Sequence, residues 1–231
     1  MVEPKRPVVL DEESEQPFPD PEGYDSEGLL AVGGDLSEAR LIEAYRSGIF
    51  PWYGEGYMPM WWSPDPRACI DPGRLHVSRS LAKTLRRCDF ELTWNTCFER
   101  VMRACGEGRD GGTWIIPEML VAYTELHRSG FAHSLEVWIE GELVGGTYGV
   151  QIGGFFGAES MFHRRTDMSK VALVAMVRSL FRKGIVLMDV QFITDHLRTL
   201  GVQERTRREY LEDLAIARDL NIDLTQVTPS V

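Results

Sequence analysis

The sequence lacks the patterns by which proteins hold structural metals. It has four cysteines, none in a C-x-x-C pair and none beside a histidine cluster: Cys69, Cys88, Cys97 and Cys105. Structural zinc needs thiolates or imidazoles at short, regular spacing. The five histidines have no such spacing, and we interpret them as packing or capping residues: His76, His127, His133, His163 and His196. We therefore expect no metal or other cofactor, and reduced thiols in the cytosol.

Long apolar runs are also missing. No stretch reaches the roughly 18 residues that a membrane-spanning helix needs. The first residues, MVEPKRPVVLDEESEQ, contain no apolar core of a secretory signal. The hydrophobic content of 43% is sufficient for a sizeable core in one large or two small domains. These features predict a cytoplasmic globular protein without a membrane segment.

Acidic charge is unevenly distributed. The formal charge is −10, yet residues 1–38 alone carry 11 acidic and 2 basic side chains. The rest of the chain is close to neutral, with 24 acidic and 23 basic side chains, and has a local basic stretch at 74–109. The ordinary interpretation of such a stretch is a solvated helix face, and the alternative is a surface that binds nucleic acid.

The second half of the sequence has the pattern of an antiparallel sheet with helices packed on it. Two predicted strands, 133–140 and 142–150, are followed by a third after a Gly-bearing hairpin turn. Apolar residues over 168–183 fall at helical spacing, Gly184 supplies a stop, and 185–192 has the composition of a buried strand. The order β-β-β-α-β-α predicts an α+β, acetyltransferase-like fold.

The first part of the chain is predicted to be a small helical, loop-rich domain over residues 1–66, before an acetyltransferase-like domain over 67–231. Asp35 or Ser37 can cap a helix there. Residues 51–67 include three tryptophans, four prolines and two glycines, a composition that favours an ordered loop. Tryptophans on such a loop suit stacking on a planar ligand, and core packing is their ordinary role.

Three helices are predicted between this loop and the first strand of the sheet. The first covers 78–87, with its basic residues outward. Thr96 and Glu99 have the spacing of a capping box at the start of the second. Pro117 suits the first turn of the third, which is expected to end near Gly130.

Two carboxylates interrupt apolar strands. Glu159 lies in FFGAESMF, and Asp189 lies in IVLMDVQF, two residues before Gln191. A buried carboxylate is costly unless it is paired or hydrogen-bonded. Residues two apart on a strand share a face, so Asp189 and Gln191 are expected to point the same way. A structural hydrogen-bond network or a solvated sheet face would account for either acid alone, whereas both acids in neighbouring strands favour a binding cleft.

A series of motifs resembles the leucyl/phenylalanyl-tRNA–protein transferases. In chain order the motifs are GLLAVGGDLS, AYRSGIFPWY, WWSPDPR, LHVSRSLAKTLRR, TWI, AYTELHRSGFAHSLEVW, LVGGTYGV, ESMFH, SKVAL, MDVQ and HLRTLG. They cover residues 17–215, nearly the whole chain. WWSPDPR and the series ESMF…SK…D-x-Q make the resemblance specific.

The resemblance implies an aminoacyltransferase of the bacterial N-degron pathway. Such an enzyme takes leucine or phenylalanine, with methionine as a further candidate, from its charged tRNA. It attaches that residue to the α-amine of a protein whose N-terminal residue is arginine or lysine, which marks the protein for degradation. The implied partners are therefore leucyl- or phenylalanyl-tRNA and those acceptor proteins. The family also has an acetyltransferase-like C-terminal domain.

The resemblance further implies roles for individual residues. Trp52, Trp114 and Glu159 match positions that hold the terminal adenosine of the tRNA, and Asp189 and Gln191 match a pair beside the reacting ester and amine. Six residues match positions that line the pocket for the aminoacyl side chain: Thr147, Phe156, Met161, Leu173, Met176 and Leu180. Four basic residues become the expected tRNA-phosphate patch: Arg79, Lys83, Arg86 and Arg87.

Two positions depart from the family's pattern. Thr147 stands where the family usually has a larger apolar residue, and Ala158 stands where it usually has glycine before Glu-Ser-Met. A hydroxyl in the pocket either finds a backbone partner or weakens apolar binding, and the added methyl group crowds the adenosine. These departures leave open the preference among leucine, phenylalanine and methionine.

The implied chemistry suits these residue types. An aminoacyl ester is already activated, so its aminolysis needs mainly positioning. We hypothesise that the carbonyl oxygen of Gln191 accepts a hydrogen bond from the attacking amine. Asp189 would fix the amide and favour the developing positive charge.

Two other functions are considered. An acyl-CoA-dependent N-acetyltransferase would hold pyrophosphate with a Gly-rich turn at a helix N-terminus, but residues 163–170, HRRTDMSK, contain no glycine. A non-catalytic RNA- or peptide-binding module would give Asp189 and Gln191 no reason to share a strand face.

Overall fold

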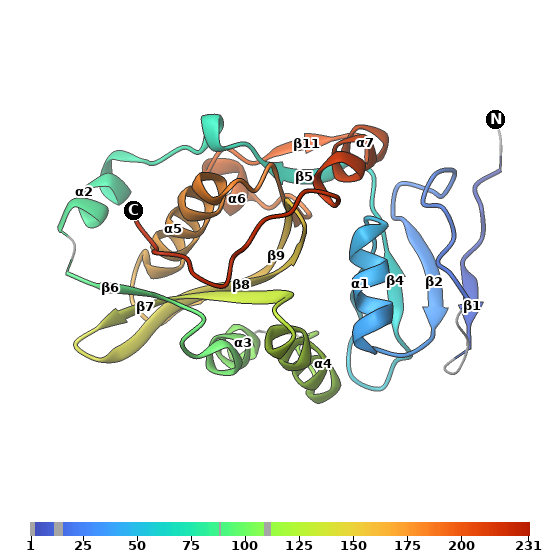
Figure 1. Ribbon diagram of the computed structural model, residues 1–231, viewed down its shortest axis with the longest axis horizontal. Coiled ribbons are helices and arrows are strands. Elements are labelled where there is room, and N and C mark those ends of the chain that lie inside the picture. The colour runs from blue at the N-terminus through green and yellow to red at the C-terminus, as the bar shows by residue number, and fades with distance from the viewer. Residues whose placement is uncertain (1–2, 12–15, 88, 109–111) are drawn as a thin grey trace.

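The computed structural model describes residues 3–11, 16–87, 89–108 and 112–231, so Cys88 lies outside the described residues. The chain forms a four-stranded sheet near its N-terminus and a seven-stranded sheet beyond it. In Figure 1 the smaller sheet lies at one end of the molecule. Helix α1 (Glu38–Arg46) lies beside it and contacts strand β8 of the larger sheet.

The smaller sheet has the order β1-β2-β4-β3. Its strands are β1 (Val8–Leu10), β2 (Leu29–Gly33), β3 (Phe50–Pro51) and β4 (Met60–Trp62). Ser37 caps α1, as one of the two predicted candidates. The sheet itself was not expected in a region predicted to be helical and loop-rich. Its strands have two to five residues, too few for an alternating pattern to be recognised.

The larger sheet has the order β11-β5-β10-β9-β8-β7-β6. Neighbouring strands are antiparallel except β9 and β10, which are parallel. Its strands are β5 (Arg67–Ile70), β6 (Glu91–Trp94), β7 (Ala132–Ile139), β8 (Glu142–Ile152), β9 (Phe155–His163), β10 (Leu187–Gln191) and β11 (Gln203–Arg205). The predicted α+β order is confirmed.

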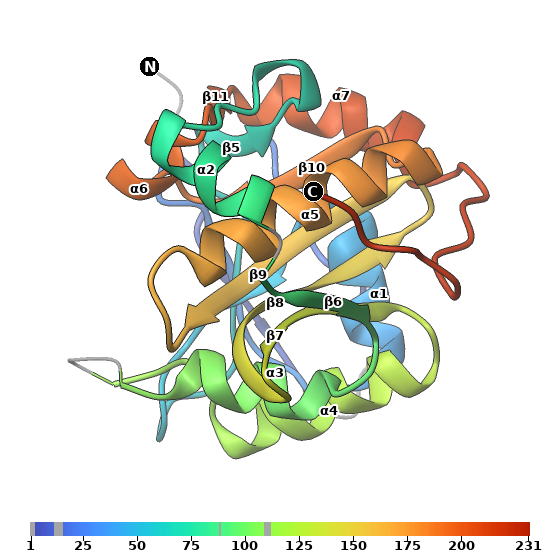
Figure 2. The same cartoon turned by 90° about the vertical axis from the view of Figure 1, so that its left-hand side faces the viewer.

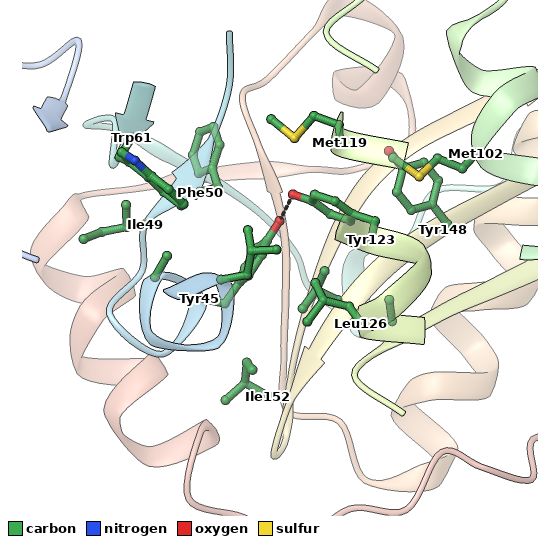
Figure 3. Packing of buried hydrophobic residues seen from close by; sticks show 14 of the residues in the cluster. Tyr45, Ile49, Phe50, Trp61, Met102, Met119, Tyr123, Leu126, Tyr148 and Ile152 are labelled. Atoms are coloured by element: carbon green, nitrogen blue, oxygen red, sulfur yellow. Dashed lines mark hydrogen bonds between the residues drawn. The ribbon is translucent and has the colours of Figure 1, made fainter. Parts of the chain in front are cut away.

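Helices cover both faces of the larger sheet. Figure 2 shows α5 on one face and α3 and α4 on the other. The helices beyond α1 are the 3-10 turn η1 (Pro72–Arg74), α2 (Arg79–Arg87), α3 (Phe98–Gly106), α4 (Pro117–Arg128), α5 (Met168–Lys183), α6 (Asp195–Thr199) and α7 (Arg207–Ala217). One core lies under α5, and the other joins α3 and α4 to the N-terminal sheet. Figure 3 shows this second core.

Helix α5 has the predicted bounds, and Gly184 ends it in the left-handed conformation with φ of 103°. The capping box predicted from Thr96 and Glu99 is wrong. Cys97 is the N-cap of α3 and makes no side-chain capping bond. Instead, the buried Glu136 of β7 accepts the backbone N–H groups of Thr96 and Cys97, both at 3.4 Å. A carboxylate from a distant strand thus replaces the local cap.

Candidate active site

A hollow of about 430 Å³ opens between the N-terminal sheet and the region where β9 and β10 lie side by side. Its walls come from β3, the segment before α4, strands β8, β9 and β10, helix α5, and the segment that leads into α6. Aromatic and aliphatic side chains form most of this surface, and Glu159 and Gln191 are its principal polar groups. An apolar hollow with a few convergent polar groups is the usual form of a small-molecule site.

Seven of the residues predicted for the site line this one hollow: Trp52, Trp114, Thr147, Glu159, Met161, Leu173 and Gln191. They come from six separate segments of the chain. The structure therefore brings together the residues predicted for the adenosine end, half of those predicted for the aminoacyl pocket, and one of the pair predicted beside the reacting groups.

The other three pocket residues, Phe156, Met176 and Leu180, lie behind the hollow rather than on its surface. All three are fully buried in the core under α5. Leu173 reaches the hollow from the N-terminal half of α5. Met176 and Leu180, about one and two turns further along the helix, pack against the sheet. The Phe156 ring lies over Gly149, where an added Cβ would come within 2.4 Å of it.

Asp189 and Gln191 do not share a strand face, so that prediction is wrong. Asp189 pairs with Cys69 and Gln191 pairs with Ala68, which makes Val190 the extra residue of a bulge. Gln191 has a φ of 60°, in the left-handed region. The bulge turns Gln191 into the hollow, whereas Asp189 is 1% exposed and faces the interior.

Asp189 has a cationic partner that the sequence did not indicate. Its carboxylate accepts two hydrogen bonds from Arg67, Nε to Oδ1 at 2.9 Å and Nη2 to Oδ2 at 2.7 Å. Arg67 is the last residue of the WWSPDPR motif. A buried carboxylate signals that some cation is needed, yet nothing local tells which of many arginines supplies it.

Glu159 is joined to two tyrosines, to one directly and to the other through the first. The Tyr45 hydroxyl donates to Oε1 of Glu159 at 2.8 Å, and the hydroxyls of Tyr45 and Tyr123 are 2.6 Å apart (Figure 3). Nε2 of Gln191 also donates to Oε1 of Glu159, at 3.3 Å. Since Tyr45 donates to the acid, Tyr123 donates to Tyr45. The chain of bonds therefore links α4, α1, β9 and β10.

Burial raises the pKa of Glu159 to about 8, and the charge of Asp189 acts in the same direction, whereas the Tyr45 hydroxyl opposes the shift. Burial, followed by the charge of Glu159, raises the pKa of Tyr45 and of Tyr123 well above the usual range. Both hydroxyls therefore remain protonated donors at neutral pH. A carboxyl group whose pKa lies near neutrality at the edge of a hollow is typical of a functional site.

The two departures from the family pattern both lie at the hollow. The Thr147 hydroxyl donates to the backbone carbonyl of Ser160 at 2.9 Å, so the hydroxyl has found a backbone partner and leaves the methyl group as its apolar contribution. The Ala158 side chain is 8% exposed and forms part of the lining, and its methyl group takes up space there.

The predicted basic patch lies on α2. Arg79, Lys83, Arg86 and Arg87 are exposed, while Leu81 and Leu85 are buried against the core under α5. The segment before α2 is tied to the end of α6, since the His76 N–H donates to the Leu200 carbonyl at 3.0 Å. Because α6 contributes Leu197 to the hollow, α2 is attached to the α6 side of the site.

Comparisons with known proteins agree with the resemblance seen in the motifs. The family model described as leucyl/phenylalanyl-tRNA protein transferase matches residues 69–215, and the model of that family's N-terminal domain matches residues 34–65. A leucyl/phenylalanyl-tRNA–protein transferase from Anaeromyxobacter sp. (strain Fw109-5) is 55% identical over 206 residues, which are 87% of each chain. One from Chromobacterium violaceum is 54% identical over 189 residues, 81% of each chain.

Among solved structures, a GCN5-related N-acetyltransferase from Kribbella flavida matches with a TM-score of 0.42 and 14% identity, over 76% of this chain and 63% of that one. Within the described part of the chain, no helix is long and apolar enough to cross a bilayer.

The two family models together account for most of the sequence, and the relatives match it over nearly their whole length. The chain therefore belongs to the leucyl/phenylalanyl-tRNA–protein transferases, a family of aminoacyltransferases.

Proposed function

We propose that this protein transfers leucine or phenylalanine, with methionine as a third candidate, from tRNA to proteins that begin with arginine or lysine. The transfer would mark those proteins for degradation in the bacterial N-degron pathway of the cytoplasm. One observation carries the proposal: Glu159 and Gln191 meet at 3.3 Å on the polar side of an otherwise apolar hollow. That arrangement suits an apolar aminoacyl group beside an amine and a cation.

The aminoacyl side chain occupies the apolar part of the hollow. Met161, Leu173 and the methyl groups of Thr147 and Ala158 contribute to this surface. A methionine adapts its shape to aliphatic or aromatic partners, which suits both leucine and phenylalanine. The same surface disfavours charged side chains, because they would lose their hydration without gaining a partner.

The terminal adenosine lies against the tryptophans. Trp52 is 45% exposed, and Trp114, on the segment before α4, lines the same hollow. Exposed indole rings bind the flat face of a base by stacking. In this assignment residues 1–66 supply the Trp52 wall, and residues 67–231 supply the aminoacyl pocket and the reacting groups.

Gln191 receives the attacking amine. Its Nε2 donates to Glu159, which directs the carbonyl oxygen Oε1 to act as the acceptor. An α-amine has a pKa of about 7.7–8.0, so an appreciable fraction is neutral at physiological pH. Its nitrogen attacks the ester carbonyl carbon, the ester C–O bond breaks, and the ribose hydroxyl leaves with the proton released by the amine. The carboxyl group of Glu159, which ionises when a cation lies beside it, favours the positive charge that develops on the nitrogen.

Glu159 also favours a basic acceptor side chain. Glu159 lies on the surface of the hollow, and Asp189 lies directly behind it, where Arg67 neutralises its charge. An arginine or lysine side chain close to Glu159 would lower the pKa of that carboxyl group and pair with the resulting carboxylate. An acceptor with a neutral first side chain gains no such pairing.

The exposed cations of α2 bind tRNA phosphates. Contacts of this kind are insensitive to sequence and become weaker as the salt concentration rises. The acceptor stem would then lie on the α6 side of the hollow, continuous with the adenosine in it.

Mass spectrometry of peptides incubated with the protein and leucyl-tRNA tests the proposal. We expect one leucine to be added to peptides that begin with arginine or lysine, and none to the same peptides with an acetylated N-terminus. Equal transfer to peptides that begin with alanine would remove the acceptor preference but leave the transferase activity. Transfer from acetyl-CoA in place of leucyl-tRNA would overturn the assignment of the hollow to an aminoacyl ester.

A further inference from the structure

We propose that Arg67 is a positioning residue for the transfer. Through Asp189 it holds the backbone of Gln191 in the conformation that turns the Gln191 amide into the hollow. This inference rests on the role proposed above for Gln191, and adds to that role the group that sets its geometry.

The Arg67 guanidinium is buried and is held by contacts with several elements. It is 1% exposed and makes the two-bond fork with Asp189. Its Nη1 donates to the carbonyl of Gly48 at 2.9 Å. The group also lies over the rings of Phe50 and Tyr210, with 4.8 and 4.4 Å to the ring centroids. A planar fork of this kind fixes the plane of the carboxylate as well as its position.

The Asp189 carboxylate, which Arg67 holds in place, also binds the backbone of Gln191. Oδ1 of Asp189 accepts the backbone N–H of Gln191 at 2.8 Å. Gln191 is one of the non-glycine residues with positive φ, a strained conformation that persists only where surrounding contacts enforce it. A hydrogen bond to a charged acceptor is stronger than one between neutral groups, and this one stabilises the strained backbone of Gln191.

The direction of the Gln191 side chain depends on that backbone conformation. In a regular antiparallel register, Gln191 would pair with Arg67 and point to the same face as Asp189, away from the hollow. The bulge at Val190 shifts it to pair with Ala68, and the side chain reaches Glu159 instead. The hydrogen bond from the Gln191 N–H to the Asp189 carboxylate spans this bulge. If the carboxylate is no longer held in place by Arg67, Gln191 is released toward the regular register.

Arg67 also connects this strand to the opposite wall of the site. Gly48 lies between α1 and β3, and Phe50 of β3 lines the hollow while its ring contacts the guanidinium. One buried cation therefore joins the N-terminal wall of the hollow to the strand that carries Gln191.

The ordinary alternative is that Arg67 only neutralises a buried acid and has no effect on the reaction. Arg207 offers a control for the loss of a buried guanidinium group elsewhere in the fold. It is also a buried arginine, 4% exposed, and its guanidinium donates to the backbone carbonyls of Pro21, Tyr24 and Asp25. Arg207→Met should lower stability through lost packing and unsatisfied carbonyls, without reaching Gln191.

The experiment measures kcat and KM for leucyl-tRNA with an N-terminal arginine peptide as acceptor. We expect Arg67→Met to lower kcat at least tenfold with the KM for leucyl-tRNA within twofold of the native value. Arg207→Met should leave both constants within twofold at a temperature where it is folded. Arg67→Lys keeps a cation beside Asp189 and so preserves the fold, but a single ammonium group cannot hold both carboxylate oxygens, and its kcat should also fall.

A double variant separates positioning from general damage. If Arg67 acts through Gln191, then Arg67→Met should lower kcat by less than twofold in a Gln191→Ala background. The inference would be overturned if the kcat loss of the double variant equalled the product of the losses of the two single variants. It would also be overturned if Arg67→Lys kept the native kcat. Native activity of Gln191→Ala alone would instead refute the proposed role of Gln191, which keeps the two failures distinct.

Discussion

At the scale of single residues, Glu159 is the titrating group of the site. Its pKa of about 8 in the folded protein means that the carboxyl group keeps its proton up to about pH 8, whereas in the unfolded chain it loses the proton near its ordinary pKa of 4.5. A group whose pKa is raised by folding binds more protons in the folded state. Its contribution to stability is therefore fully present below pH 4.5 and is lost as the pH rises through 8.

Glu159→Gln should remove this pH dependence. Between pH 5 and 8.5 the native protein should lose about 1–2 kcal/mol more unfolding free energy than the variant. This loss is smaller than the whole pKa shift of Glu159 would give, because the side chain is partly exposed to solvent. Urea unfolding at the two pH values measures the difference. Glu209→Gln is the control, because hydrogen bonds from Thr206 lower the pKa of that carboxyl group, so it stays ionised across this pH range. If the unfolding free energy of Glu159→Gln changed with pH as much as that of the native protein, Glu159 would not be the titrating group.

At the scale of elements, helix α5 divides its residues between the hollow and the core. Leu173 lines the hollow, and Leu180, two turns further along, is fully buried behind it. Regular helical spacing predicted that α5 packs on the sheet, but it could not tell which apolar residue lies at the open end of the contact. The position of the open end depends on which part of the larger sheet is left uncovered by the N-terminal sheet and α6.

Leu173→Ala should change substrate preference, whereas Leu180→Ala should change only stability. Removal of the Leu173 side chain enlarges the pocket, so we expect kcat/KM for leucyl-tRNA to fall about tenfold, with a smaller loss for phenylalanyl-tRNA. Leu180→Ala leaves a core cavity that costs about 2–5 kcal/mol, with the ratio of the two substrates unchanged. Kinetics with the two charged tRNAs and urea unfolding measure these effects. A changed ratio in Leu180→Ala would place that residue in the pocket after all.

At the scale of the whole molecule, charge is separated along its long axis. Figure 1 shows α2, which carries the exposed cations, at the end opposite the N-terminal region, whose residues 1–38 are rich in acidic side chains. A dipolar molecule of this kind orients an incoming polyanion toward its basic end, and the effect declines as salt screens the charges.

Arg86→Glu combined with Arg87→Glu should raise the KM for leucyl-tRNA about tenfold at an ionic strength of about 0.15 M, and should flatten its salt dependence. The control is Arg208→Glu, which reverses an exposed charge on α7. Steady-state kinetics over a range of salt concentrations measure both. A KM unchanged by the double reversal would remove α2 from the tRNA-binding surface.

Local patterns determined the order of strands and helices from 132 to 191, because each of those elements is long enough to show its own periodicity. The motifs determined the family, because their order along the chain is itself a sequence property. The position of Glu159 in an apolar strand likewise marked it before any contact was known.

Only the tertiary structure decided which groups meet. Arg67 and Asp189 are 122 residues apart, and Tyr45 and Glu159 are 114 apart, so no local pattern couples them. The bulge beside Gln191 reversed the direction expected for its side chain, since one extra residue in a strand exchanges the two faces. Which cation balances an acid, and which way a side chain points, are settled by how whole elements pack.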